Sequence, residues 1–172
     1  GQSFFENAGG SYTCGQVIDR LHRFYTQRKV QPYGSYAVSQ LGGAEMDEAR
    51  TRLAAMMNVE TDELSFGPST SQNTYVLAHA FAETLSPGDV VIVTDQDHEA
   101  NSGAWRRLEA RGMEVREWQI NDETGQLETE TLAGLLDEKV KLVCFPHCSN
   151  IIGQENPVPE ICLLYTSPSP RD

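Results

Sequence analysis

The sharpest change of pattern along the chain falls within residues 63–73. Leu64 and Phe66 alternate with polar neighbours, which predicts a short strand, and Gly67-Pro68 then ends the alternation. From Ser71 onward the apolar residues return at helical spacing, as Val76, Leu77, Ala80, Phe81 and Leu85. The pattern therefore predicts a strand, a turn of small residues and a helix in which these five residues supply the apolar positions.

Two helices are expected before this stretch. The first covers about residues 14–29, where apolar side chains recur at helical spacing. The second is indicated by a later apolar series, Met46, Ala49, Leu53 and Met56. Its first turn would contain the acids Glu45, Asp47 and Glu48, as the helix dipole favours. Residues 30–41 lie between the two helices and show no clear period, so they are expected to form either a functional loop or a surface connection.

The second half of the chain alternates between strands and helices. Residues 90–94 form a continuous apolar run of strand length, which is typical of a strand buried on both faces. Residues 113–118 alternate and have one wetter face, as an edge strand would, and residues 140–145 form a third strand. Helices are expected around Trp105 and Leu132. The chain is therefore predicted to be α/β, with a largely parallel sheet, flanking helices and right-handed crossovers.

Polar residues stand at two places where α/β proteins bind ligands, a helix start and the end of a buried strand. Thr70 and Ser71 open the helix after Gly67-Pro68, where unpaired backbone N–H groups and hydroxyls converge and suit a phosphate. The same residues could also cap the helix with no ligand bound. His98 follows the buried strand at residues 90–94, at the carboxyl edge of a parallel sheet. Alone, it could equally be a surface or capping histidine.

The acidic balance of the chain limits its partners. The 13 basic and 25 acidic residues give a formal net charge of −12, which argues against nucleic acid or an anionic membrane. No apolar run approaches the roughly 18–20 residues of a membrane span, and no signal-peptide pattern opens the sequence, so a cytoplasmic location is expected. The four cysteines lack the spacing of a disulfide framework. Cys144, His147 and Cys148 lack a second pair of ligands, so no metal site is expected.

Three polar segments, each just after a strand, resemble those of one known family. They are residues 67–73 (Gly-Pro-Ser-Thr-Ser-Gln-Asn), 97–101 (Asp-His-Glu-Ala-Asn) and 147–153 (His-Cys-Ser-Asn-Ile-Ile-Gly). In this order and spacing they resemble class V aminotransferase-fold enzymes, and most closely the cysteine desulfurase and selenocysteine lyase-like group. The resemblance covers about residues 4–161. It implies part of the large domain of a fold type I pyridoxal 5′-phosphate (PLP) enzyme, a family whose members are usually homodimers.

The resemblance implies a role for each matched position. Thr70 and Ser71 would hold the PLP phosphate at the helix N-terminus. His98 would stack on the pyridine ring and assist proton transfer, which makes it the candidate catalytic residue, and Asn150 would hydrogen-bond the phenolic oxygen. These roles are chemically reasonable, because a flat ring favours a flat partner on its free face and its anionic ends favour N–H and amide donors.

The substrate side of the site is implied by the segment Asn7-Ala8-Gly9-Gly10, which resembles the N-terminal substrate loop of the family. Ala8 and Gly9 would lie near the carboxylate of a small amino-acid substrate. Tyr36 stands where desulfurases often have a histidine, which leaves the identity of that amino acid open.

The lysine that forms the Schiff base with PLP in this family has no match in the chain. In the family it follows the Asn150 segment, as does the carboxylate beside the pyridine nitrogen. Lys139 and Lys141 flank or begin an early strand and are not substitutes. Residues 162–172 depart from the family pattern and contain two prolines, which we expect to prevent a helix. We interpret residues 1–161 as the N-terminal part of a PLP-dependent transferase-like domain, and residues 162–172 as an artefactual or disordered tail of a truncated chain.

Two properties of such a fragment follow. It is expected to be inactive alone, because the lysine is missing. It is also expected to be poorly soluble, because a strand at residues 64–67 would lack its neighbours in the sheet. Three functions remain open: a PLP-dependent lyase or desulfurase that acts on an amino acid such as cysteine, a PLP-dependent aminotransferase or epimerase, and a non-catalytic α/β module that keeps a phosphate site.

Overall fold

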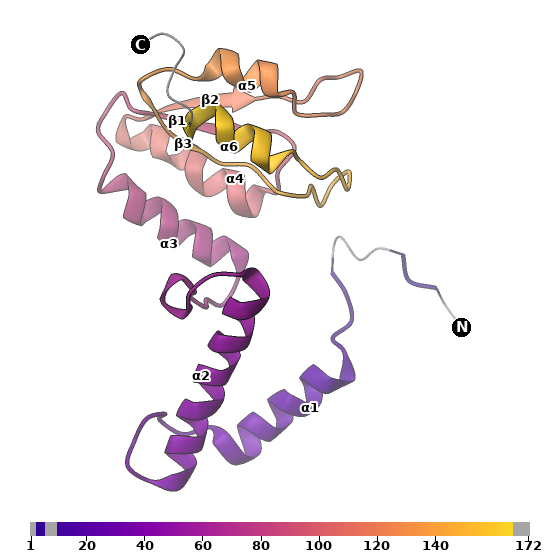
Figure 1. Cartoon of the computed structure of the whole chain (residues 1–172), viewed down its shortest axis with the longest axis vertical. Coiled ribbons are helices and arrows are strands. Elements are labelled where there is room, and N and C mark those ends of the chain that lie inside the picture. Colours follow the sequence, from indigo (N-terminus) through magenta and orange to yellow (C-terminus); the bar gives the residue numbers. More distant parts are fainter. Residues whose placement is uncertain (1–2, 6–9, 167–172) are drawn as a thin grey trace. The chain divides into compact units, whose positions relative to one another are not determined.

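The chain forms two compact units, which are described separately below. The structure is a computed structural model, and it describes residues 3–5 and 10–166 (Figure 1). The first unit comprises Gly1–Phe66 and the second Gly67–Asp172. None of the helices in the described residues combines the length and the hydrophobicity that crossing a bilayer requires.

The first unit is built from two helices. α1 spans Gly15–Arg23 and continues as a π-helical segment, η1, over Phe24–Arg28, which confirms the helix expected at residues 14–29. α2 spans Ala37–Met57 and is followed by a short 3₁₀ turn, η2, at Thr61–Glu63. α2 ends at Asn58, which adopts a left-handed conformation with φ 54°.

The start of α2 differs from the prediction. Because the helix begins at Ala37, the acids Glu45, Asp47 and Glu48 lie in its interior, and the expected connecting segment extends only as far as Tyr36. The helix contains consecutive glycines, which lower helix propensity and hide it in the sequence. Gly43 is required there, because a Cβ would lie 2.6 Å from Cδ1 of the Tyr33 ring.

Polar contacts hold α1 and η1 to α2. Glu45 of α2 accepts a hydrogen bond from Arg23 at 2.9 Å, and Arg20 and Arg28 lie 3.4 and 3.5 Å from its carboxylate. α1 buries none of its residues, and its apolar side chains Val17, Ile18 and Leu21 are about half exposed. The first unit therefore has little apolar core of its own.

The second unit is a three-stranded parallel sheet with helices on both faces. In chain order its elements are α3 (Thr70–Ala82), β1 (Val90–Thr94), α4 (Glu99–Arg106), η3 (Arg107–Arg111), β2 (Glu114–Trp118), α5 (Thr129–Leu135), β3 (Val140–Val143) and α6 (Val158–Thr166). The strand order is β2-β1-β3, with both pairs parallel. All five residues of β1 are buried, so the predicted α/β class, the buried central strand and the edge position of β2 are confirmed.

Alternate residues of β1 supply the two faces of the core. Val91 and Val93 pack with α3 and α4, in a cluster that includes Ala78, Ala82, Ala104, Trp105, Leu108 and Met113. Val90 and Ile92 pack on the other face, in a cluster with Trp118, Leu127, Leu132 and Ile161. The sheet is thus covered on both sides, as Figure 1 shows for α4 and α5.

The expected strand at Leu64–Phe66 is wrong. These residues have extended or irregular backbone and form no ladder with any strand of the described chain. Phe66 is 58% exposed. A strand persists only where a neighbour pairs with its backbone groups, and the described sheet offers none at this segment.

The buried face of α3 also differs from the pattern. α3 buries Thr74, Ala78 and Ala82, whereas Val76 and Leu77 are 62% and 51% exposed. The partner helix explains the choice, because α4 presents Ser102, Gly103 and Ala104 among its buried residues. Two rows of small side chains allow the helices to pack closely, and this contact decides which face is buried.

The expectation that residues 162–172 form no helix is wrong for residues 162–166. α6 continues across Ile161 and Cys162 to Thr166, so residues 162–166 are helical. The two prolines, at residues 168 and 170, lie outside the described residues.

Candidate functional site

The N-terminus of α3 has free hydrogen-bond donors. Ser69 is the N-cap: its hydroxyl accepts from the backbone N–H of Gln72 at 3.2 Å, and its carbonyl accepts from Asn73 N at 2.9 Å. Thr70 and Ser71 are therefore the first two helical residues and not the cap. In the described part of the chain no protein group accepts from their backbone N–H groups. Their exposed hydroxyls add to this set of donors, which suits a phosphate.

In the turn before α3, the side-chain amide of Asn73 lies against the backbone of Gly67. A Cβ at Gly67 would overlap the amide of Asn73, one turn into the helix. Within α3, the Thr74 hydroxyl donates to the Thr70 carbonyl at 2.9 Å. The backbone of residues 67–74 therefore folds tightly on itself, and the free donors of Thr70 and Ser71 face solvent. This arrangement fits an anionic group at the helix start.

His98 is the N-cap of α4. Its Nδ1 accepts a hydrogen bond from the backbone N–H of Ala100 at 2.9 Å, so the geometry assigns the proton of the neutral ring to Nε2. The side chain is exposed. The capping role left open by the sequence is therefore real, and it leaves the Nε2–H available to a ligand.

Asp97 fixes the backbone around His98. Its carboxylate accepts from His98 N at 2.7 Å and from the Asn101 side-chain amide. Asn101 in turn accepts from Trp105 Nε1 at 3.1 Å, which ties this turn to the core. Burial raises the pKa of Asp97 from its ordinary value, and the hydrogen bonds from Asn101 and His98 oppose that rise. The loop after β1 is thus well fixed at the residue that carries the imidazole.

Asn150 lies in the loop that follows β3. The loop closes through a bridge between Cys148 and Glu155, and the Ser149 N–H donates to the Gln154 carbonyl at 2.8 Å. Gly153 N donates back to the Ser149 carbonyl at 2.9 Å. Asn150 is exposed at the tip of this closed turn. Because β1 and β3 are parallel neighbours, the Asn150 and His98 loops share one edge of the sheet.

The structure thus brings together the loops predicted to form one site within the second unit. α3 and α4 pack side by side, and in Figure 1 both begin on the side of the unit where β1 ends. Thr70, Ser71, His98 and Asn150 all belong to this unit. The two substrate positions, Ala8 and Gly9, lie outside the described residues.

The lysines of the second unit lie at the opposite edge of the sheet. Lys139 precedes β3 and Lys141 is near its start, whereas the Asn150 loop follows its end. Lys141 Nζ donates to the Glu138 carbonyl at 3.0 Å. Neither amine is placed at the site, in line with the expectation that these lysines are not substitutes.

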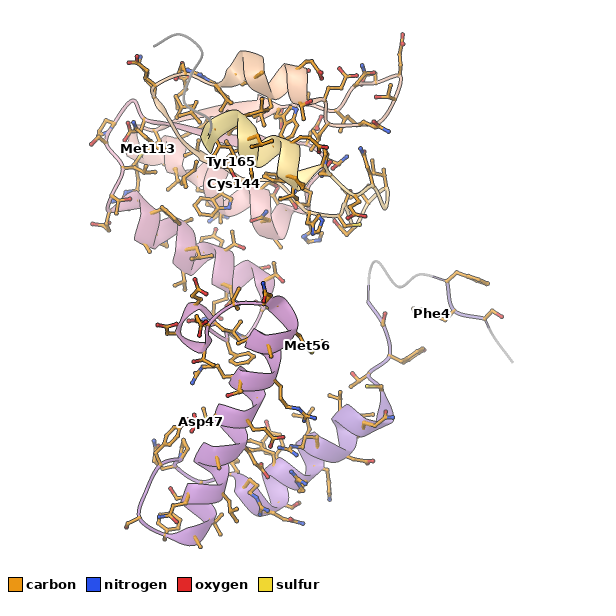
Figure 2. All side chains as sticks on the ribbon, viewed as in Figure 1. Phe4, Asp47, Met56, Met113, Cys144 and Tyr165 are labelled. Carbon is orange, nitrogen blue, oxygen red and sulfur yellow. The ribbon has the colours of Figure 1, made fainter. Side chains whose placement is uncertain are left out.

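Cys144 lies directly after β3, and Cys148 lies in the loop that carries Asn150. Cys144 packs against the core, and its position is labelled in Figure 2. Burial, with a contribution from the charge of Asp97, raises the pKa of its thiol to about 12. A thiol of this kind is inert. Cys148 and His147 are exposed, and His147 Nε2 lies 3.3 Å from Glu155. Over the residues that the structure describes, no three His, Cys, Asp or Glu side chains are grouped for a metal ion.

The sequence reasoning missed three buried polar residues behind the site. Gln96, Ser149 and Asn156 are each 2 to 3% exposed. They connect the loop after β1 to the loop after β3. The only signal in the sequence was that each stands in a polar segment between a strand and a helix, a signal that exposed loop residues share.

Comparison with known proteins shows which family the chain resembles in sequence. The family model for class-V aminotransferases matches residues 3–166. A cysteine desulfurase of Serratia proteamaculans is 31% identical over 92% of this chain and 40% of its own length. An aminotransferase-like protein of Gibberella zeae is 36% identical, over 93% of this chain and 41% of its own length.

A solved structure supports the same fold. That of a NifS-like protein superposes with a TM-score of 0.85 at 22% identity, and the match covers 93% of this chain and 44% of the other. The chain thus spans about 40% of the length of the curated relatives that it matches. Its fold is the incomplete PLP-dependent transferase fold that the resemblance implied. The chain belongs to the class-V aminotransferase family, and within it the chain is similar to the cysteine desulfurases.

Proposed function

We propose that the chain carries the cofactor-holding part of a PLP enzyme that acts on a small amino acid, with cysteine as the favoured substrate. The observation that carries the proposal is the set of free donors at the start of α3, at the same edge of the unit as His98 and Asn150. The cysteine desulfurase relatives support the choice of substrate. The homodimer expected from the resemblance and the cytoplasmic location expected from the sequence remain parts of this proposal.

Thr70 and Ser71 would hold the phosphate. Two backbone N–H groups and two hydroxyls are available there, and the dipole of the 13-residue helix favours an anion at this end. Donors that are already oriented bind a charged acceptor at small entropic cost.

His98 and Asn150 would contact the ring. Bound PLP supplies an electron sink for negative charge at the substrate α-carbon. The His98 imidazole offers a flat face, and its Nε2–H can donate a hydrogen bond, because Nδ1 already accepts from the Ala100 N–H. The exposed amide of Asn150 offers a hydrogen-bond donor to a phenolic oxygen. His98 is therefore proposed as the catalytic residue and Asn150 as a binding residue.

We further propose that the 172-residue chain binds PLP without a covalent bond. Lys139 and Lys141 lie at the far edge of the sheet, and Lys29, in the first unit, has its ammonium over the Tyr25 ring at 5.1 Å. Borohydride reduction of the PLP-treated chain, followed by peptide mass spectrometry, should find no single preferred lysine. One stoichiometric adduct at a specific lysine would refute this part of the proposal.

The phosphate contacts are tested by titration with 4′-deoxypyridoxine 5′-phosphate, which lacks the aldehyde and cannot react with amines. Thr70→Val and Ser71→Ala should each weaken binding about tenfold, because each removes a hydrogen bond to a charged group. Thr129→Val is the matched control, since Thr129 is the first residue of α5 and carries a comparable hydroxyl. Equal affinities for wild type, Thr70→Val and Thr129→Val would refute the proposal.

A further inference from the structure

A buried network of amides joins the two loops that carry His98 and Asn150. It consists of Gln96, in the loop after β1, and Ser149, Gln154 and Asn156, in the loop after β3; we call it the amide network. The Gln96 side chain donates to Gln154 Oε1 at 2.8 Å and accepts from Asn156 Nδ2 at 2.8 Å. Its backbone carbonyl accepts from the Ser149 hydroxyl at 3.0 Å. One residue thus makes three hydrogen bonds to the opposite loop.

The network also shapes the turn that presents Asn150. The Ser149 hydroxyl accepts from Ile151 N and Ile152 N at 3.2 and 3.4 Å. Asn156 closes the other end of the turn, because its Nδ2 donates to the Pro146 carbonyl and its backbone N–H donates to the His147 carbonyl, both at 2.8 Å. Asn150 therefore projects from a turn whose two ends are both anchored to Gln96.

The same network lies directly before His98. Gln96 adjoins Asp97, whose carboxylate accepts from the His98 N–H. A displacement of Gln96 would move the start of α4 and with it the ring that caps the helix. The positions of His98 and Asn150 relative to each other are thus set through Gln96.

One acceptor atom in this network has no hydrogen-bond partner in the described structure. Asn156 is 2% exposed, and its Oδ1 has no hydrogen-bond partner within the described structure. A buried acceptor without a partner costs free energy, which the two hydrogen bonds donated by Asn156 Nδ2 to Gln96 and Pro146 offset. A role in placing the loops explains why an amide is present at this position.

We propose that Gln96 and Asn156 are positioning residues for the cofactor site: through the amide network they hold the ring-facing histidine and the amide of Asn150 at the separation that a bound pyridoxal ring requires. This inference rests on the proposed function. Neither residue touches the cofactor; each acts through the loop that it anchors.

The test compares three variants of the 172-residue chain. Gln96→Met and Asn156→Leu keep the side-chain size and remove the network. Leu132→Ala is the control for lost stability, because Leu132 is fully buried in the cluster on the other face of the sheet and lies outside the network. Affinity is measured with 4′-deoxypyridoxine 5′-phosphate and, separately, with inorganic phosphate, and backbone amide exchange is followed at Ala100, Ile151 and Ile152.

Gln96→Met and Asn156→Leu should each weaken binding of the pyridoxine phosphate about tenfold or more, as loss of supporting hydrogen bonds does at other binding sites, and leave the affinity for inorganic phosphate unchanged. Gln96→Met should accelerate amide exchange in both loops, whereas Leu132→Ala should change neither affinity. Wild-type affinity in the network variants, or faster exchange confined to one loop, would overturn the inference. Failure of the wild type to bind either probe would instead refute the proposed function, and the exchange rates alone would then decide whether Gln96 couples the loops.

Discussion

The face that α3 buries can be tested with one chemical change made at two positions. Ala78 is 3% exposed and lies in the cluster with Val93 and Trp105, whereas Ala80 is exposed. The helical pattern in the sequence predicts the reverse, since it includes Ala80 among the apolar positions and omits Ala78. Alanine to leucine at each position therefore separates the structure from the pattern.

The expected magnitudes follow from the packing. Ala78→Leu adds three carbon atoms between α3 and α4, and overpacking of this kind costs about 1–3 kcal/mol. Ala80→Leu adds the same atoms in solvent, where substitutions change the free energy of unfolding by about 0.5 kcal/mol or less. We expect Ala78→Leu to destabilise the chain by at least about 0.5 kcal/mol more than Ala80→Leu does, which is roughly twofold or more in the unfolding equilibrium constant.

Urea unfolding followed by tryptophan fluorescence measures the difference. Trp105 is a suitable probe, because it packs in the same cluster as Ala78 and its ring centroid lies 5.9 Å from that of Phe81. Far-UV circular dichroism on the same samples would show whether α3 itself remains helical. Equal destabilisation by the two variants, or a larger loss in Ala80→Leu, would refute the buried face described here.

Three further predictions concern single side chains. Burial raises the pKa of Asp97, so the folded chain binds the Asp97 proton more tightly than the unfolded chain does. This proton stabilises the folded state at low pH, and the stabilisation is lost as the pH rises through the titration of Asp97. In urea unfolding, Asp97→Asn should therefore become more stable relative to wild type between pH 4 and pH 7. Iodoacetamide should modify the exposed Cys148 in the folded chain, whereas Cys144, whose thiol pKa burial raises to about 12, should react only after urea is added. Peptide mass spectrometry measures both reactions. Equal labelling of the two cysteines in the folded chain would contradict the burial of Cys144. Glu45→Gln should lower the stability of the first unit by about 0.5–1 kcal/mol, because Arg23 loses a charged partner at 2.9 Å, and faster amide exchange in α1 would report it.

Much of the second unit was readable from local pattern. The continuous apolar run at β1, the alternation at β2 and the turn before α5 each depend on residues that are close in sequence. The turn shows why: Asn121 Oδ1 accepts from Glu123 N and Thr124 N at 2.8 and 3.2 Å, so its chemistry is complete within four residues. Such elements need only their own sequence to be recognised.

Elements that depend on distant contacts were not readable in this way. The start of α2 was hidden because its glycines lower helix propensity, and Gly43 is explained only by the Tyr33 ring against it. The strand at Leu64–Phe66 was expected from alternation alone, but no described neighbour pairs with it. Alternation shows that a segment can form a strand, and only pairing forms one.

The candidate site also combines features that the local sequence predicts with features that depend on distant contacts. The sequence by itself determined that Thr70 and Ser71 begin a helix and that His98 follows a buried strand, because helix starts and strand ends are local properties, and the resemblance to the family added Asn150. Only the tertiary structure decided that His98 caps α4 through Nδ1 and that Gln96 and Asn156 are buried and bonded to each other. Those two amides are 60 residues apart in the chain, and they meet only because β1 and β3 pair in parallel and end at the same edge of the sheet.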